Sequence, residues 1–94
     1  MRLTTNEINS ILSIVRKYDS AASVHLFGSR TDDRKRGGDI DLLIFSGKLI
    51  FKHSLKIKID LKSILGDQRI DIIIAKDRSN PFVNLVYEDS LRLV

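Results

Sequence analysis

The sequence has no cysteine, one proline and no long apolar run. The absence of cysteine excludes a disulfide framework, a zinc site built on thiolates and a cysteine nucleophile. No apolar stretch approaches the ~20 residues that a membrane-spanning helix needs, and the first residues lack the apolar core of a signal peptide. We therefore expect a soluble, cytoplasmic protein without a membrane segment.

The composition that remains is typical of a folded domain. The 94 residues are 43% hydrophobic and 30% charged, which indicates a globular chain and not a disordered one. This length accommodates one hydrophobic core, so we predict a single domain over residues 1–94. The net charge of +4 suits an anionic partner such as a nucleotide, a nucleic acid or an acidic protein, but it equally suits an ordinary basic surface.

Three segments have the signals of helices. We expect them over residues 5–18, over residues 51–65 and from about residue 82. Thr4 and Glu7 have the spacing of a capping box before the first helix, and Asn80-Pro81 opens the last one. The middle segment is ambiguous, because its apolar residues fit strand alternation as well as a helical stripe. Its length without turn residues and the stop at Gly66 favour a helix.

Runs of β-branched and other apolar residues predict the strands. They lie over residues 24–27, 39–45 and 69–75, with a short edge strand over residues 91–94. The resulting order is helix, strand, strand, helix, strand, helix. Strands separated by helices in this way predict an α/β (α+β) domain with one mixed β-sheet flanked by helices.

Three aspartates interrupt these apolar strands. Asp39 and Asp41 are two residues apart on one strand, so their side chains project from the same face with α-carbons ~6.5–7 Å apart. Asp71 lies in the strand that we expect beside it. Carboxylates gathered on one face repel each other unless a cation lies between them, and an all-oxygen ligand set selects Mg²⁺ or Mn²⁺. An isolated Asp-x-Asp pair is more often a strand-entry cap than a metal site, so the pair alone does not establish metal binding.

The segment Phe27-Gly28-Ser29-Arg30 ends the strand that precedes this pair. Glycine allows a tight turn and a close approach of the backbone to a ligand. The Ser29 hydroxyl and the N–H groups of a following helical turn could hold a phosphate, and Arg30 could add charge. A Gly-Ser turn followed after nine residues by Asp-Ile-Asp places a phosphate cradle beside a carboxylate pair. Nucleotidyl transfer requires this arrangement.

The ordered motifs of the chain resemble the DNA polymerase β-type nucleotidyltransferase superfamily, and most closely its small stand-alone members, the minimal nucleotidyltransferases (MNT). The resemblance covers nearly the whole chain and is carried by residues 26–30, 39–44 and 66–73. It implies a polymerase β-like nucleotidyltransferase fold. It also implies that Gly28 and Ser29 hold the nucleotide triphosphate with Arg30 beside them. Catalysis and binding of two Mg²⁺ ions would fall to Asp39, Asp41 and Asp71.

The same resemblance implies a partner and a substrate. Minimal nucleotidyltransferases are commonly paired with a HEPN-domain ribonuclease toxin, which they neutralise as antitoxins (the HEPN–MNT toxin–antitoxin pairs). Some of them transfer AMP from ATP to a tyrosine of the toxin. We therefore expect a Mg²⁺-dependent protein adenylyltransferase of the EC 2.7.7 class that uses ATP and forms a hetero-oligomer with its toxin.

Two other functions remain open from the residues. One is a non-catalytic antitoxin that neutralises its partner by binding alone; the other is a small-molecule, aminoglycoside-type nucleotidyltransferase. The short chain favours a protein acceptor, because larger relatives bind small substrates through a second domain. The lysine-rich face of residues 52–62 has no interleaved aromatic side chains, so we do not expect direct nucleic-acid binding. His25 lies between apolar neighbours, where a histidine is more often a packing residue than a catalytic one.

Overall fold

The computed structural model describes residues 3–28, 39–66 and 68–93. The elements are α1 (Thr5–Tyr18), β1 (Ser23–Phe27), β2 (Ile40–Phe45), α2 (Phe51–Leu65), β3 (Ile70–Ala75), α3 (Pro81–Glu88) and β4 (Leu91–Arg92). All predicted helices and strands are present in the predicted order. In the described part of the chain, none of the helices combines the length and apolar character that a membrane crossing requires.

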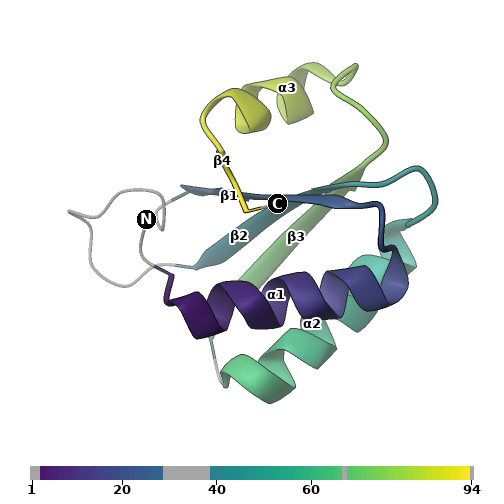
Figure 1. Cartoon of the computed structure of the whole chain (residues 1–94). Helices are drawn as coiled ribbons and strands as arrows, with labels where there is room; N and C mark the ends of the chain where they lie inside the picture. Colours follow the sequence, from purple (N-terminus) through teal and green to yellow (C-terminus); the bar gives the residue numbers. More distant parts are fainter. Residues whose placement is uncertain (1–2, 29–38, 67, 94) are drawn as a thin grey trace.

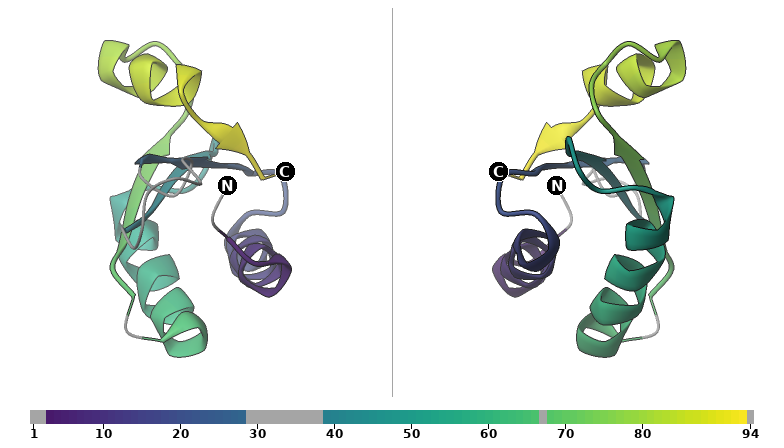
Figure 2. Two further views of the ribbon diagram at one scale, coloured as in Figure 1. Left: turned by 90° about the vertical axis from the view of Figure 1, so that its left-hand side faces the viewer. Right: turned by 90° about the vertical axis from the view of Figure 1, so that its right-hand side faces the viewer.

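The four strands form one mixed sheet in the order β3-β2-β1-β4. β1 is antiparallel to both β2 and β4, whereas β2 and β3 are parallel and are joined through α2. α1 and α2 cover one face of the sheet, and α3 lies on the other face (Figures 1 and 2). The predicted mixed sheet flanked by helices is therefore confirmed.

The local signals of the helix ends are formed as the sequence predicts. The Thr4 hydroxyl accepts a hydrogen bond from the Glu7 N–H at 3.1 Å, and Glu7 accepts one from the Thr4 N–H at 2.9 Å. The side chain of Asn80 accepts hydrogen bonds from the first turn of α3. Gly66, at φ +85°, ends α2 in a backbone conformation that favours glycine. The ambiguous segment is a helix, and Ile57 and Leu61 form its buried side.

The core lies between the sheet and the α1–α2 layer. Ile40, Leu42 and Ile44 of β2 are fully buried there, against α1 and α2 residues such as Ile11 and Ile57. Because side chains alternate along a strand, the odd-numbered residues of β2 project from the opposite face. That face carries the polar side chains of the sheet, and α1 and α2 do not cover it (Figure 2).

Candidate active site

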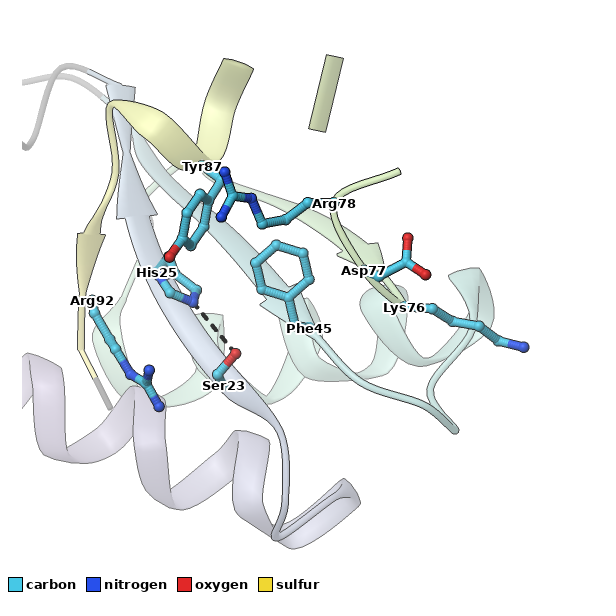
Figure 3. Close-up of a pocket in the computed structure, with 8 residues that line it drawn as sticks. All are labelled: Ser23, His25, Phe45, Lys76, Asp77, Arg78, Tyr87 and Arg92. Atoms are coloured by element: carbon cyan, nitrogen blue, oxygen red, sulfur yellow. Dashed lines mark hydrogen bonds between the residues drawn. The ribbon is translucent and has the colours of Figure 1, made fainter. Parts of the chain in front are cut away.

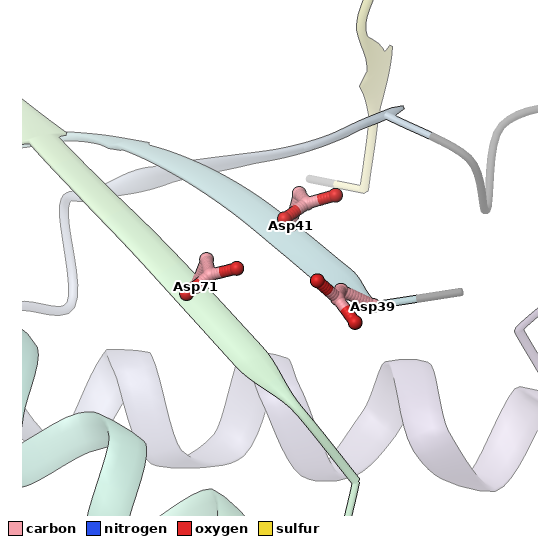
Figure 4. A group of neighbouring side chains, drawn as sticks. All are labelled: Asp39, Asp41 and Asp71. Atoms are coloured by element: carbon pink, nitrogen blue, oxygen red, sulfur yellow. The ribbon is translucent and has the colours of Figure 1, made fainter.

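The three predicted aspartates converge on the face opposite the core. Asp41 lies directly beside Asp71 in the parallel register of β2 and β3, and Asp39 immediately precedes β2. One carboxylate oxygen from each residue lies within 4.8 Å of the other two (Figure 4). All three residues are half-buried. The parallel pairing of the two strands therefore brings residues from two distant segments to one point.

The electrostatics of this cluster is dominated by negative charge. Partial burial raises the pKa of Asp41, and the charges of Asp71 and Asp39 and a hydrogen bond with Asp71 act in the same direction. Arg69 opposes this effect: its Nε lies 3.5 Å from Asp39 Oδ2 and 4.0 Å from Asp71 Oδ2. Arg69 was not singled out in the sequence. Its position two residues before Asp71, on the same strand face, was the signal that could have found it.

The donor set fits a divalent cation. The cluster offers carboxylate oxygens and neither nitrogen nor sulfur ligands, which is the preference of Mg²⁺ and Mn²⁺. An ion held there would separate the like charges that raise the pKa of Asp41. The cluster could therefore hold a metal ion, as the sequence predicts.

Gly28 lies against this cluster at the end of β1. Its φ is +78°, and its neighbour Phe27 is paired with Asp41 across the β1–β2 ladder. A Cβ atom added at this position would lie 2.3 Å from Asp41 Oδ2. Glycine is therefore required here both by the backbone conformation and by the position of the Asp41 carboxylate. Ser29 and Arg30, the other predicted nucleotide-binding residues, lie outside the described residues.

A pocket of about 370 Å³ adjoins the aspartates and extends around the β3 edge to α2. It is lined by Phe27, Asp41, Phe51, Ser54, Leu55, Lys58, Asp71, Ile72 and Ile73. None of these α2 residues was predicted from the sequence to belong to a site. Phe51 and Leu55 could have indicated a functional surface in the sequence, because they are spaced by one helical turn and lie off the buried stripe of α2.

The repulsion among the aspartates has a measurable consequence for stability. Because the pKa of Asp41 is raised in the folded state, this group favours folding below the ordinary aspartate pKa, and that contribution is lost as the pH rises through the raised value. At neutral pH, Mg²⁺ or Mn²⁺ should therefore raise the melting temperature, and Asp41→Asn should raise that of the metal-free protein.

Thermal unfolding with metal and with chelator, at neutral and at acid pH, measures both effects. The metal-induced rise should be smaller in Asp41→Asn and smaller at acid pH. A metal response of equal size in the wild type and in Asp41→Asn would show that the cluster does not hold the ion.

The comparison with known proteins agrees with this geometry. The family model described as "Polymerase beta, Nucleotidyltransferase" matches residues 9–94, which include Gly28 and all three aspartates. No curated protein is similar enough in sequence to count as a relative. The α+β architecture, with a four-stranded mixed sheet, is that of the polymerase β-like nucleotidyltransferase fold. The chain therefore belongs to the polymerase β-type nucleotidyltransferase family.

Proposed function

We propose that this protein is a Mg²⁺-dependent minimal nucleotidyltransferase that transfers AMP from ATP to a tyrosine hydroxyl of a HEPN-domain ribonuclease toxin and thereby acts as its antitoxin. Membership of the nucleotidyltransferase family supports the reaction class. The observation that carries the proposal is the convergence of Asp39, Asp41 and Asp71 within 4.8 Å. Three carboxylates at this spacing repel one another. A divalent metal ion bound between them would offset this repulsion, and metal-assisted phosphoryl transfer uses such an ion.

The aspartates would have distinct roles in this reaction. Asp39 and Asp41 would hold the metal, which when bound offsets the negative charge of the triphosphate. The acceptor oxygen forms a bond to the α-phosphorus while the bond to the β-phosphate oxygen breaks, and pyrophosphate leaves. Asp71, on the neighbouring strand, would take the proton of the acceptor hydroxyl. Gly28 would keep the space next to the Asp41 carboxylate open.

A surface beside the aspartates supports a protein as the acceptor. Phe51, Leu55 and Ile59 of α2 are 74%, 49% and 68% exposed and follow each other at one-turn spacing. Phe51 and Leu55 also line the pocket that contains Asp41 and Asp71, so this α2 stripe is continuous with the site. Large apolar side chains exposed side by side are typical of protein interfaces.

The charges around the α2 stripe indicate the chemistry of the partner. Four lysines of α2 surround it: Lys52, Lys56, Lys58 and Lys62. A protein face with an apolar centre and an acidic rim would complement this surface. Such a face would place a hydroxyl of the partner close to Asp71. Transfer to a free small molecule would not require this surface.

Incubation of this protein with the product of the neighbouring gene, as the candidate toxin, in the presence of ATP and Mg²⁺ tests the proposal. Mass spectrometry should detect an adenylyl increment on a toxin tyrosine, and chelation of the metal should prevent it. An unmodified toxin that is nevertheless inactivated would show neutralisation by binding alone. Modification of an added aminoglycoside in place of the toxin would show the small-molecule reaction.

The same assay examines the α2 stripe with a matched pair of variants. Ile59→Glu should slow transfer at low toxin concentration about tenfold, the loss expected for one interface anchor. Leu85→Glu is the control, because Leu85 is 64% exposed on α3, across the sheet from α2. A loss of transfer in Leu85→Glu with normal transfer in Ile59→Glu would place the acceptor on the α3 side.

A further inference from the structure

A second hollow lies on the same face of the sheet as the aspartates, at the opposite end of β2 and β3. Its floor consists of the rings of His25, Phe45 and Tyr87, which come from β1, β2 and α3 (Figure 3). Their centroids are 5.3 to 5.7 Å apart, and each pair is arranged edge to face. We refer to this place as the aromatic hollow.

Basic side chains border the aromatic hollow. The guanidinium carbon of Arg78 lies 4.2 Å from the centroid of the Tyr87 ring, and Arg78 Nε donates a hydrogen bond to Asn84 at 2.8 Å. Arg92 lines the other side, next to His25 (Figure 3). Lys76 and the carboxylate of Asp77 also belong to the lining, so cations outnumber anions by three to one.

The floor of the aromatic hollow is uncharged. His25 is only 3% exposed, and this burial lowers its pKa, with the charge of Arg92 acting in the same direction. The imidazole is therefore neutral at physiological pH and packs as an aromatic ring. The positive charge of the hollow comes from its rim alone, and the apolar rings lie below it.

The aromatic hollow is separate from the aspartate cluster. Phe45 is four residues beyond Asp41 on β2, which corresponds to about 13 Å along the strand. The lining of the hollow contains none of the residues that line the pocket at Asp41 and Asp71. A ligand of the hollow would therefore not need the aspartates or their metal.

We propose that the aromatic hollow is a second binding site, for a nucleotide unit, with the base against the rings and the phosphate between Arg78 and Arg92. A bare phosphate would contact the arginines of the rim but not the aromatic floor. An uncharged apolar ligand would contact the floor but would offer the arginines no anionic group. Base stacking on aromatic side chains combined with cations for the phosphate is the recurring solution for nucleotide units. The volume of about 330 Å³ is at the lower end of pockets that hold small ligands.

Nuclear magnetic resonance titrations of the full chain test this site. The probes are AMP, adenosine and ribose 5-phosphate, each added with EDTA so that no divalent metal is present. AMP should shift the resonances of His25, Phe45, Arg78 and Tyr87. It should bind at least about tenfold more tightly than either half of the molecule, because base and phosphate have separate partners.

Two variants and two controls locate the binding. Arg78→Gln should weaken AMP about fivefold or more and adenosine much less, since it removes a charged partner of the phosphate. Arg16→Gln, an exposed arginine of α1, should have no effect. Tyr87→Leu should weaken adenosine and AMP alike. Asp41→Asn should leave AMP binding as it is.

Two results would overturn the proposal. One is AMP binding that Arg78→Gln leaves unchanged, and the other is AMP binding that Asp41→Asn abolishes. The second result would assign the observed binding to the aspartate cluster. Because every titration omits metal and acceptor, failure here is distinct from failure of the transfer reaction.

Discussion

Replacement of Asp41 by asparagine should reduce the proposed nucleotidyl transfer by about 10³-fold or more, while the proposed toxin partner remains bound. Asp41 is paired with Asp71 across the strands and is two residues from Asp39, and it contributes to the cluster from the beginning of β2. Asparagine has nearly the same shape but supplies one neutral oxygen. It would therefore weaken metal binding and remove a negative charge that the reaction needs. The fold should be retained, because a neutral amide avoids both the burial of a charge and the repulsion by Asp71 and Asp39, which together raise the pKa of Asp41.

The measurement is the rate at which the proposed toxin partner is adenylylated, followed by mass spectrometry, together with a separate binding assay. Asp39→Asn should give a loss of similar size. Asp89→Asn, an exposed aspartate at the end of α3, is the control and should transfer at the wild-type rate. Full transfer by Asp41→Asn would refute the proposed chemistry. Lost transfer with undiminished neutralisation of the toxin would show that masking is sufficient.

The fold and the aspartate cluster were predictable from the sequence because their signals are local. Each strand is marked by its apolar run, and the alternation within a strand places Asp39 and Asp41 on one face. The strand that contains Asp71 was expected beside the strand of Asp39 and Asp41; the structure confirms this, and its register pairs Asp71 with Asp41. The segment of α2 could be assigned because a 15-residue run without turn residues is longer than a typical strand.

The features that the sequence did not show depend on register and on contacts between distant elements. The aromatic hollow joins His25, Phe45 and Tyr87, which lie far apart in the chain and have no common motif. The contact of Gly28 with Asp41 requires the β1–β2 register, because a turn glycine alone indicates only a change of direction. Such juxtapositions appear only once the sheet is assembled.

The contact between Gly28 and Asp41 leads to the second large effect that we expect. Gly28→Ala should lower nucleotidyl transfer by about 10²-fold or more, because misplacement of a reacting group by ~1 Å has effects of this size. The new Cβ would lie 2.3 Å from Asp41 Oδ2, so the carboxylate must leave the position in which it now faces Asp39 and Asp71. Metal affinity should fall together with activity.

Gly66→Ala separates this displacement from backbone strain. Gly66 has φ +85°, close to the +78° of Gly28, but among the described residues, its chain neighbours aside, nothing lies within 4 Å of a Cβ added there. Both variants should therefore lose roughly 1–2 kcal/mol of unfolding free energy from the left-handed conformation, as denaturant titration can measure. Only Gly28→Ala should lose transfer and metal binding. Equal activity in the two variants would mean that the close approach of Gly28 to Asp41 has no part in the reaction, and that the left-handed turn alone explains the glycine.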